Sequence, residues 1–351
     1  MTSNAPSDGP GPDRTGPRRR LIVFGCVTGL ATAFALGPRV DFEERWIEPE
    51  LPGDLQAYVG AADSGLVDLR VGDERGIVWA DGDTRGRTPA SVVYLHGFSA
   101  DRHEIEPVVT DLARTLDANV YFTRLSGHGR DGAAMAEATV EDWLDDTAEA
   151  VAIGERLGEH VVLVGTSTGG TLAVWAATRP EAKDRISALV LLSPNFHPKD
   201  RSSRVLLYPW GGVLARLVVG QERCFDPLNE AQERHWTTCY PTSALSPMMA
   251  LVEHVRSLDS SPIEAPTLVL YSPDDDVVDA TETERLLSGR EGEGVHLQMV
   301  EGSSDPARHV LAGDIVSPDS NAEVLHRIVS FLESVLPVAP PATRLGPRSS
   351  R

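Results

Sequence analysis

A serine with a glycine two residues away on either side is the clearest chemical feature of this chain. Residues 165–169 read GTSTG, a match to the pattern G-x-S-x-G. In this pattern the serine sits on a sharp turn between a strand and a helix, and the glycines let the backbone pass closely. The start of the helix directs the Thr168 amide and the helix dipole towards the serine hydroxyl. The motif therefore predicts Ser167 as a nucleophile.

The residues on both sides of the motif have the composition that such a turn requires. Residues 161–164 are β-branched and aliphatic, which is typical of a fully buried strand. Residues 171–178 are small and apolar enough to begin a buried helix. Five residues alone would also fit a glycine-rich turn that only reverses the chain, but this strand-to-helix context favours the nucleophile.

A serine hydroxyl is a poor nucleophile at neutral pH, so it needs a histidine base that a carboxylate orients. Three aspartates, Asp274, Asp275 and Asp276, directly follow the predicted strand at residues 267–271. His309 lies between the last predicted strand and the closing helix. Because the carboxyl ends of parallel strands meet at one edge of a sheet, we expect these groups to lie close to Ser167.

The remaining histidines have weaker claims to the role of base. His96 and His128 stand in short glycine-containing loops, where we expect their rings to support the backbone through hydrogen bonds. His296 falls in a predicted strand and His326 in a predicted helix, and structural roles suit both. No motif includes the other five, which are His103, His160, His197, His235 and His254.

Strands and helices alternate along the chain at a spacing that predicts an α/β fold with a mostly parallel sheet and helices on both faces. The predicted strands span residues 91–95, 119–122, 161–164, 186–192, 267–271 and 295–300. The predicted helices span residues 101–116, 139–157, 282–287 and 321–335. Residues 195–261 break this rhythm with aromatic residues, methionines and prolines, and we interpret them as an inserted cap.

With these motifs in order, residues 91–336 resemble the α/β-hydrolase superfamily, and within it the serine carboxylesterase and monoacylglycerol-lipase-like group. Five segments carry the resemblance: HGF at 96–98, GHG at 127–129, GTSTG at 165–169, the aspartates after residue 271, and RHV at 308–310. Together they cover most of the chain and are far more specific than any one of them.

The resemblance implies an α/β-hydrolase fold, with Ser167 as nucleophile and His309 as base. It implies that the backbone amides of Phe98 and Thr168 form an oxyanion hole. It also implies supporting roles around the turn and the first loop for Gly165, Gly169, His96 and Gly97. The acid is expected three residues after a glycine at the strand end. Ser272 replaces that glycine here, so Asp275 matches, with Asp274 and Asp276 as neighbouring alternatives.

Composition excludes several classes of function. The net charge of −20 and a pI near 4.9 argue against nucleic acid, whose phosphates an acidic surface repels. The three cysteines form no C-x-x-C pair and the histidines lack metal-ligand spacing, so we expect neither a metal nor a cofactor. Cys224 and Cys239 fit either a disulfide outside the cytoplasm or two separate buried thiols.

The N-terminus predicts targeting. Residues 1–17 are rich in proline, glycine, serine and aspartate, which indicates disorder. Arg18, Arg19 and Arg20 then precede an uncharged stretch at residues 21–36. We interpret residues 18–37 as a signal peptide or signal anchor, and expect a membrane-anchored or exported protein. The hydrolase domain would span residues 38–336, followed by a disordered tail at 337–351.

The expected activity is hydrolysis of carboxylic esters with an apolar acyl group, through a Ser-His-Asp triad and an acyl-enzyme. A serine aminopeptidase or a thioesterase on the same fold remains an alternative. A peptidase would need a cap carboxylate to hold the substrate amine, and Glu222, Glu230 and Glu233 are available. A non-catalytic binding protein of this fold is the alternative of a different class.

Overall fold

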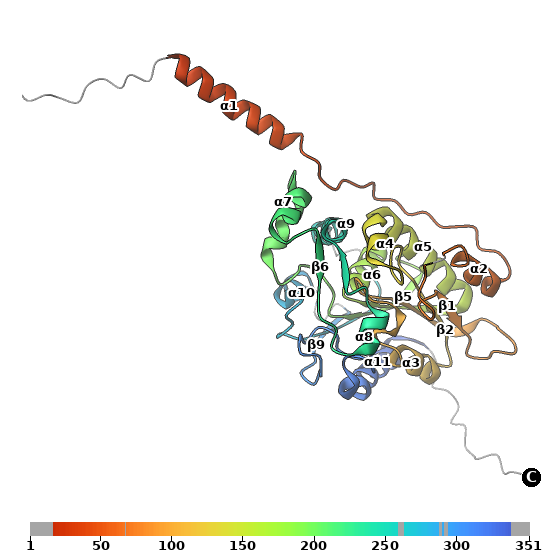
Figure 1. The fold of residues 1–351 in the computed structure, drawn as a ribbon. Helices are drawn as coiled ribbons and strands as arrows, with labels where there is room; N and C mark the ends of the chain where they lie inside the picture. The colour runs from red at the N-terminus through yellow and green to blue at the C-terminus, as the bar shows by residue number, and fades with distance from the viewer. Residues whose placement is uncertain (1–16, 67, 259–262, 288–289, 291–293, 338–351) are drawn as a thin grey trace, which may run out of the picture.

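The computed structural model describes residues 17–66, 68–258, 263–287, 290 and 294–337 (Figure 1). Within this part of the chain a seven-stranded sheet has the order β1-β3-β2-β4-β5-β8-β9. β1 pairs antiparallel with β3, and the other neighbours are parallel, so the predicted mostly parallel sheet is confirmed. The strands are β1 (Gly76–Val78), β2 (Thr88–Leu95), β3 (Asn119–Phe122), β4 (Gly158–Thr166), β5 (Ile186–Leu192), β8 (Thr267–Tyr271) and β9 (Val295–Met299).

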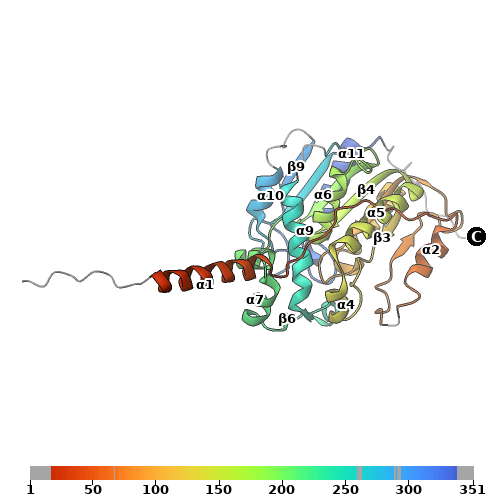
Figure 2. The same cartoon turned by 90° about the horizontal axis from the view of Figure 1, so that it is seen from above.

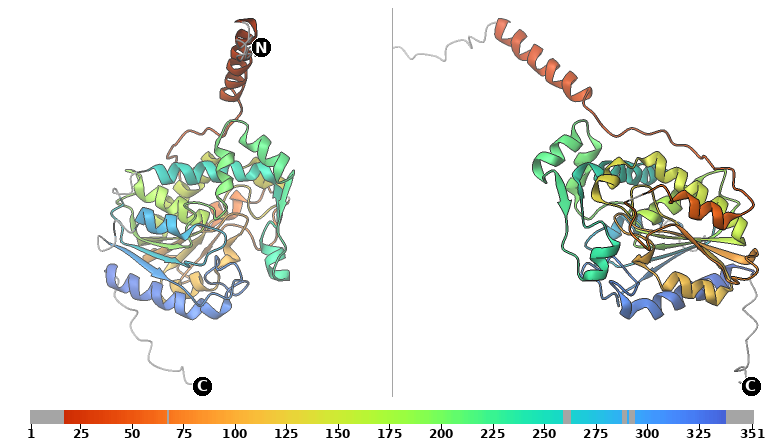
Figure 3. Two further views of the ribbon diagram at one scale, coloured as in Figure 1. Left: turned by 90° about the vertical axis from the view of Figure 1, so that its left-hand side faces the viewer. Right: turned by 45° about the vertical axis from the view of Figure 1, so that its right-hand side comes forward.

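Helices cover both faces of this sheet, as Figures 1 and 3 show. α3 (Val108–Leu116) and α11 (Asn321–Val335) pack on one face, and α5 (Val140–Leu157), α6 (Thr168–Thr178) and α9 (Leu245–Ser257) on the other. Successive strand residues point to opposite faces, so Val92 joins one apolar core and Val93 the other. Shorter helices are α4 (Gly132–Glu137), α10 (Ala280–Leu287) and the 3-10 turn η5 (Pro318–Ser320).

Local capping explains where several helices begin. The Thr139 side chain accepts from the Asp142 amide while the Asp142 side chain accepts from the Thr139 amide, a capping box that starts α5 as predicted. The helix predicted over residues 101–116 is instead split into η1 (Arg102–Glu104) and α3, because Pro107 has no N–H to donate within a helix. Asp54 caps a helix that was not predicted, α2 (Leu55–Ala62).

The segment between β5 and β8 departs from the strand–helix alternation (Figure 1). β6 and β7 form an antiparallel pair, and a disulfide joins Cys224 of β6 to Cys239 of β7. Its elements are η2 (Arg201–Leu207), α7 (Gly211–Val218), β6 (Glu222–Cys224), α8 (Glu230–His235), β7 (Cys239–Pro241), η3 (Thr242–Ala244) and α9. The cap limits at residues 195 and 261 stay a prediction.

The first helix stands away from the α/β body (Figures 1 and 2). α1 (Pro17–Ala35) meets the remainder of the chain near its end, where the Trp210 indole donates to the Ala33 carbonyl at 2.9 Å. Among the described residues, no helix is both long and apolar enough to cross a membrane. This finding contradicts the membrane anchor expected at residues 18–37. Three arginines open α1, and the uncharged stretch after them falls short of the roughly 20 residues of a span.

Residues 38–54, called here the N-terminal segment, lie across the outer surface of α5, α6 and α9 (Figure 2). Trp46 stacks on Trp175 of α6 with ring centroids 5.4 Å apart. Arg45 pairs with Asp145 of α5 at 2.5 Å, and Glu44 pairs with Arg179 at 2.6 Å. The disorder predicted for residues 1–17 and 337–351 falls almost wholly outside the described residues.

Candidate active site

Ser167 occupies the turn between β4 and α6. Its backbone has φ 51° and ψ −114°, a conformation that a residue with a Cβ adopts only under strain. Two backbone hydrogen bonds hold it there: its amide donates to the Leu192 carbonyl at 2.9 Å, and its carbonyl accepts from the Asn195 amide at 3.0 Å. The side chain is nearly buried, and the first helical residue, Thr168, follows directly. This is the strand–turn–helix geometry that the motif predicts.

The two motif glycines leave no space for a side chain. A Cβ on Gly169 would lie 2.0 Å from the Leu95 carbonyl oxygen, and one on Gly165 would lie 2.4 Å from the Gly169 carbonyl oxygen. The α6 backbone therefore packs directly against the end of β2. That contact brings the turn that carries Ser167 next to the loop that carries Phe98.

Asp275 and His309 meet at the same edge of the sheet, beyond the ends of β8 and β9. His309 Nδ1 lies 2.8 Å from Asp275 Oδ2. The other carboxylate oxygen of Asp275 accepts from the backbone amides of Val277 and Val278, both at 2.8 Å. Asp275 is 1% exposed, whereas the side chain of Asp274 is 78% exposed. Of the three neighbouring aspartates, the structure thus places Asp275 against His309.

The loop before His309 is organised by a buried residue that sequence reasoning missed. One carboxylate oxygen of Asp305 accepts from the backbone amides of His309 at 3.0 Å and Val310 at 2.8 Å. The Asp305 amide in turn donates to the hydroxyl oxygens of Ser303 and Ser317, at 3.2 and 3.1 Å. No periodic pattern marks such a residue, because its partners are backbone groups of an irregular loop.

Burial and nearby charges act in opposite directions on His309. Burial alone lowers the pKa of the imidazole, but the Asp275 carboxylate, with smaller contributions from Glu104 and Asp305, outweighs it and raises the pKa above 6.5. Because the Asp275 carboxylate favours the protonated ring, it makes His309 a stronger proton acceptor.

His96 supports the first loop as a neutral ring. Its Nε2 accepts from the Leu125 amide at 3.0 Å, so its Nδ1 carries the proton and donates to the Gly97 carbonyl at 2.9 Å. Complete burial lowers the pKa of His96 to about 4, and burial likewise lowers that of His128 to about 3. Neither ring is poised to exchange protons near neutral pH.

The Phe98 ring packs edge-on against three aromatic rings from different segments. They belong to His128 at 5.6 Å, Tyr240 at 5.4 Å and Trp143 at 6.2 Å between ring centroids. Among the described residues, no acceptor is hydrogen-bonded to the backbone amides of Phe98 and Thr168. Two amides without acceptors beside a strained serine can donate hydrogen bonds to an anionic oxygen.

Glu104 is a second buried residue that the sequence did not single out. Its carboxylate accepts from the Gly97 amide and from the Tyr94 hydroxyl, both at 2.8 Å. Burial raises its pKa to about 7, although these two hydrogen bonds favour the ionised form. Through its hydrogen bond with the Gly97 amide, Glu104 therefore stabilises the loop that carries Phe98.

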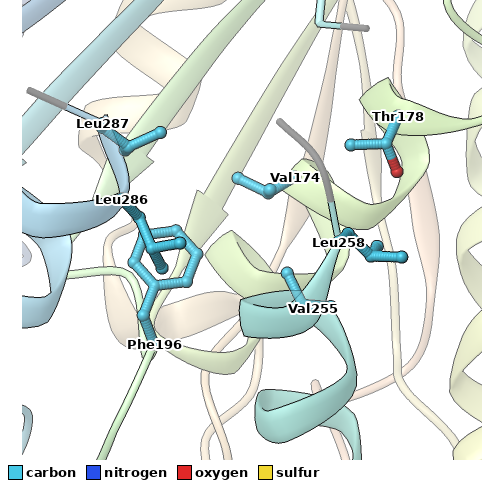
Figure 4. Close-up of a pocket in the computed structure, with 7 residues that line it drawn as sticks. All are labelled: Val174, Thr178, Phe196, Val255, Leu258, Leu286 and Leu287. Carbon is cyan, nitrogen blue, oxygen red and sulfur yellow. The ribbon is translucent and has the colours of Figure 1, made fainter. Parts of the chain in front are cut away.

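A small apolar pocket lies elsewhere, between α6, α9 and α10 (Figure 4). Its lining is almost entirely aliphatic and aromatic: Val174, Thr178, Phe196, Val255, Leu258, Leu286 and Leu287. None of the candidate catalytic residues lines it, so this pocket is a packing feature of the helical layer.

A family model described as serine aminopeptidase, S33, matches residues 86–309, from just before β2 to His309. The chain belongs to this family. The match includes every segment that resembled an α/β-hydrolase except Val310, and this hydrolase has the fold that the sequence predicted.

Relatives of this hydrolase include lipases and esterases. A thermostable monoacylglycerol lipase from Bacillus sp. (strain H-257) is 29% identical over 89 residues, which cover 25% of this chain and 35% of that protein. The matched part thus spans about a third of the relative's length.

Solved structures show the same fold. A structure reported with the metagenome-derived lipolytic enzymes LipS and LipT has a TM-score of 0.58 at 20% identity, and covers 76% of this chain and 99% of its own. The monoacylglycerol lipase of Paleococcus ferrophilus has a TM-score of 0.54 at 21% identity, covering 74% and 98%. A soluble variant of the Saccharomyces cerevisiae monoglyceride lipase, bound to a substrate analog, has a TM-score of 0.56 at 12% identity, covering 75% and 92%.

Proposed function

We propose that this α/β-hydrolase cleaves carboxylic esters with Ser167 as nucleophile, His309 as general base and Asp275 as the carboxylate that orients the base. The observation that carries the proposal is the 2.8 Å contact between His309 Nδ1 and Asp275 Oδ2, at the sheet edge where the strained Ser167 turn lies. β4, β8 and β9 run parallel in one sheet, so the segments after them emerge on the same side.

In the first half of the reaction, His309 takes the proton of Ser167 Oγ as this oxygen attacks the ester carbonyl carbon. The carbonyl oxygen becomes an oxyanion, which the amides of Phe98 and Thr168 stabilise; losing one such donor typically costs about 3–4 kcal/mol in the barrier. The intermediate then collapses, its C–O bond to the alcohol breaks, and His309 returns the proton to the departing alcohol.

The second half repeats this chemistry with water. His309 takes a proton from a water molecule, whose oxygen attacks the acyl carbon bound to Ser167. Collapse of the second intermediate breaks the bond to Ser167 Oγ, which recovers its proton from His309 as the acid leaves. Throughout, Asp275 orients and stabilises the imidazolium through its contact with His309 Nδ1, while the backbone amides of Val277 and Val278 hold its other oxygen in place.

An apolar acyl group is the substrate class that the surroundings favour. The half-buried Phe98 ring, on the loop that carries one proposed oxyanion donor, packs against the buried rings of Trp143 and Tyr240 and presents apolar surface beside the site. The family description names an aminopeptidase, whereas the two relatives named monoacylglycerol lipases point to acylglycerol esters. The three cap carboxylates considered for a peptidase, Glu222, Glu230 and Glu233, are all exposed.

The test is labelling with a fluorophosphonate probe, which reacts with activated serines. We expect the wild type to be labelled and Ser167→Ala to be unlabelled, with kcat/KM for p-nitrophenyl esters reduced by roughly 10⁴-fold or more. Ser193→Ala is the matched control, because Ser193 also follows a sheet strand with positive φ. Labelling that survives in Ser167→Ala and disappears in Ser193→Ala would contradict the assignment.

The same assay distinguishes the candidate substrates. Esters of graded acyl length are compared with an aminoacyl p-nitroanilide, and we expect the esters to react faster by orders of magnitude. Faster cleavage of the anilide would establish the aminopeptidase instead. The acid limb of kcat/KM should have its midpoint above pH 6.5, because only neutral His309 accepts a proton and its pKa is raised.

A further inference from the structure

Four side chains from three distant segments converge outside the proposed active site. Asp73 precedes β1, Asp101 and His103 follow the loop that carries Phe98, and His235 ends α8. One oxygen or nitrogen of each lies within 4.8 Å of the corresponding atom of the other three. No metal-ligand spacing is visible in the sequence because the three segments that carry these residues are far apart along the chain; the fold brings them together.

The separations between these atoms are those of a small coordination shell. His235 Nδ1 lies 3.0 Å from Asp73 Oδ1 and 3.1 Å from Asp101 Oδ2. His103 Nδ1 lies 2.9 Å from Asp101 Oδ1 and 3.9 Å from Asp73 Oδ1. Zinc binds nitrogen and carboxylate oxygen at about 2.0–2.2 Å, so neighbouring ligand atoms in a tetrahedron lie roughly 3.3–3.6 Å apart. Small shifts of the side chains would reach that geometry.

The cluster also gathers two carboxylates away from water. The side chains of Asp73 and Asp101 are 0% and 1% exposed, so both carboxylates are out of water. Arg70 pairs with Asp73 at 2.7 Å, and neutral imidazoles would leave the pair one positive charge short. Buried carboxylates that face each other need a cation between them or a shared proton.

The groups around the cluster have the arrangement that supports metal ligands. The second oxygen of Asp73 accepts from Arg70 Nε, and Asp101 Oδ1 accepts from the His103 amide at 2.7 Å. On the far side of the His103 ring, Nε2 lies 4.0 Å from a carboxylate oxygen of Glu106. Metal-binding histidines commonly present their second nitrogen to a carboxylate, and ligating carboxylates are themselves hydrogen-bonded.

We propose that Asp73, Asp101, His103 and His235 bind one divalent transition-metal ion, with zinc the best match. Two imidazoles and two carboxylates suit zinc better than calcium or magnesium, which prefer oxygen ligands. With four protein ligands the shell is complete, so the ion would be structural rather than catalytic.

The ion would fasten the cap to the loop that carries Phe98. His235 is the last residue of α8, and two residues later the Thr237 amide donates to the Ser99 carbonyl at 2.7 Å. Asp101 and His103 lie on the other side of this contact, in the segment that begins with Ser99. The proposal concerns stability and metal content, and it stands or falls independently of the ester-hydrolase proposal.

The test uses the full chain with any affinity tag removed, because polyhistidine tags bind zinc. Metal is stripped with a chelator, ZnCl₂ is added, and unbound ion is removed before the zinc content is measured by mass spectrometry. We expect about one zinc per chain and a rise in Tm on zinc addition that MgCl₂ does not give. Replacement of zinc by Co²⁺ should give the visible absorption of a four-coordinate site.

Two variants locate the ion. His235→Gln and Asp101→Asn should each reduce bound zinc to less than a tenth and abolish the Tm rise, whereas His160→Gln, a half-buried histidine outside the cluster, should change neither. Circular dichroism identifies a variant that fails to fold, and the wild-type zinc titration needs no variant. Substoichiometric zinc and no Tm shift in the wild type would overturn the proposal and identify a proton-bridged network instead.

Discussion

Two clusters in this hydrolase pair histidine with buried aspartate, and they differ in what balances the negative charge. At the proposed catalytic site a single carboxylate, Asp275, meets a single imidazole, His309, and two backbone amides satisfy its remaining oxygen. At the cluster beside α8, two carboxylates, Asp73 and Asp101, meet two imidazoles. One arginine, Arg70, pairs with Asp73.

The difference separates the proposed proton-transfer site from the proposed ion-binding site. A lone carboxylate whose charge is already stabilised leaves its histidine free to exchange a proton with a third group. Histidines between two facing carboxylates are not free in this way, because the two negative charges repel each other unless a cation stays between them. The same residue types therefore predict different chemistry according to how many acids converge.

The largest expected effect comes from neutralising one aspartate in each cluster. Asp275→Asn should lower kcat by roughly 10⁴-fold, since an amide no longer stabilises the imidazolium or fixes its tautomer. Asp101→Asn should lower kcat less than tenfold but abolish zinc binding. Steady-state kinetics and metal analysis on both variants check this crossed pattern; equal losses of kcat would remove the distinction between the clusters.

A smaller effect should follow from removing the disulfide. Cys224 and Cys239 close a loop with a sequence separation of 15 that contains α8 and His235. The double variant Cys224→Ser, Cys239→Ser should lower the free energy of unfolding by up to about 3 kcal/mol. It should also weaken zinc affinity more than it lowers kcat, because α8 carries a metal ligand and no triad residue.

Urea unfolding and zinc titration measure both effects of the disulfide. Cys26→Ser is the matched control, because Cys26 is an exposed free thiol in α1. A double variant with unchanged zinc affinity but lower kcat would indicate that the loop supports the catalytic site instead.

The smallest effect concerns Glu104, whose pKa responds to both His309 and Asp101. Its folded pKa is raised to about 7 from an ordinary value of 4.5, so its contribution to stability is complete below pH 4.5 and lost as the pH rises through 7. Glu104→Gln should remove this loss, on the order of 1–3 kcal/mol between pH 4.5 and 7.5.

Urea unfolding at both pH values measures this effect of Glu104. Glu106→Gln is the control, because the partly exposed Glu106 pairs with Arg102 at 3.1 Å. A Glu104→Gln protein that loses as much stability as the wild type over this range would show that Glu104 is not responsible.

Features that depend on neighbouring residues along the chain were the ones that sequence could predict. The closing helix at residues 321–335, the strand at 186–192 and the Thr139 cap occur where their patterns placed them. The split of the helix before residue 108 was missed because periodicity outweighed the signal of Pro107. α2 was missed although Asp54 is a standard capping residue.

Features that depend on distant partners were not predictable. Glu104 is an ionisable residue that is buried, and nothing near it in the sequence indicates that the Gly97 amide and the Tyr94 hydroxyl will donate to its carboxylate. His235 and Asp101 are 134 residues apart and meet only because α8 returns to the sheet edge. Among the three aspartates after β8 the resemblance favoured Asp275, but only the position of the His309 ring separates it from Asp274 and Asp276.

The N-terminal segment at residues 38–54 has a practical consequence for work on this protein. It supplies the outer cover of α6, the helix that begins beside Ser167, through the Trp46–Trp175 stack and the Glu44–Arg179 pair. The matched family region starts only at residue 86. A shortened protein that begins there would expose Trp175 to solvent and lose β1, so a soluble fragment should begin no later than residue 38.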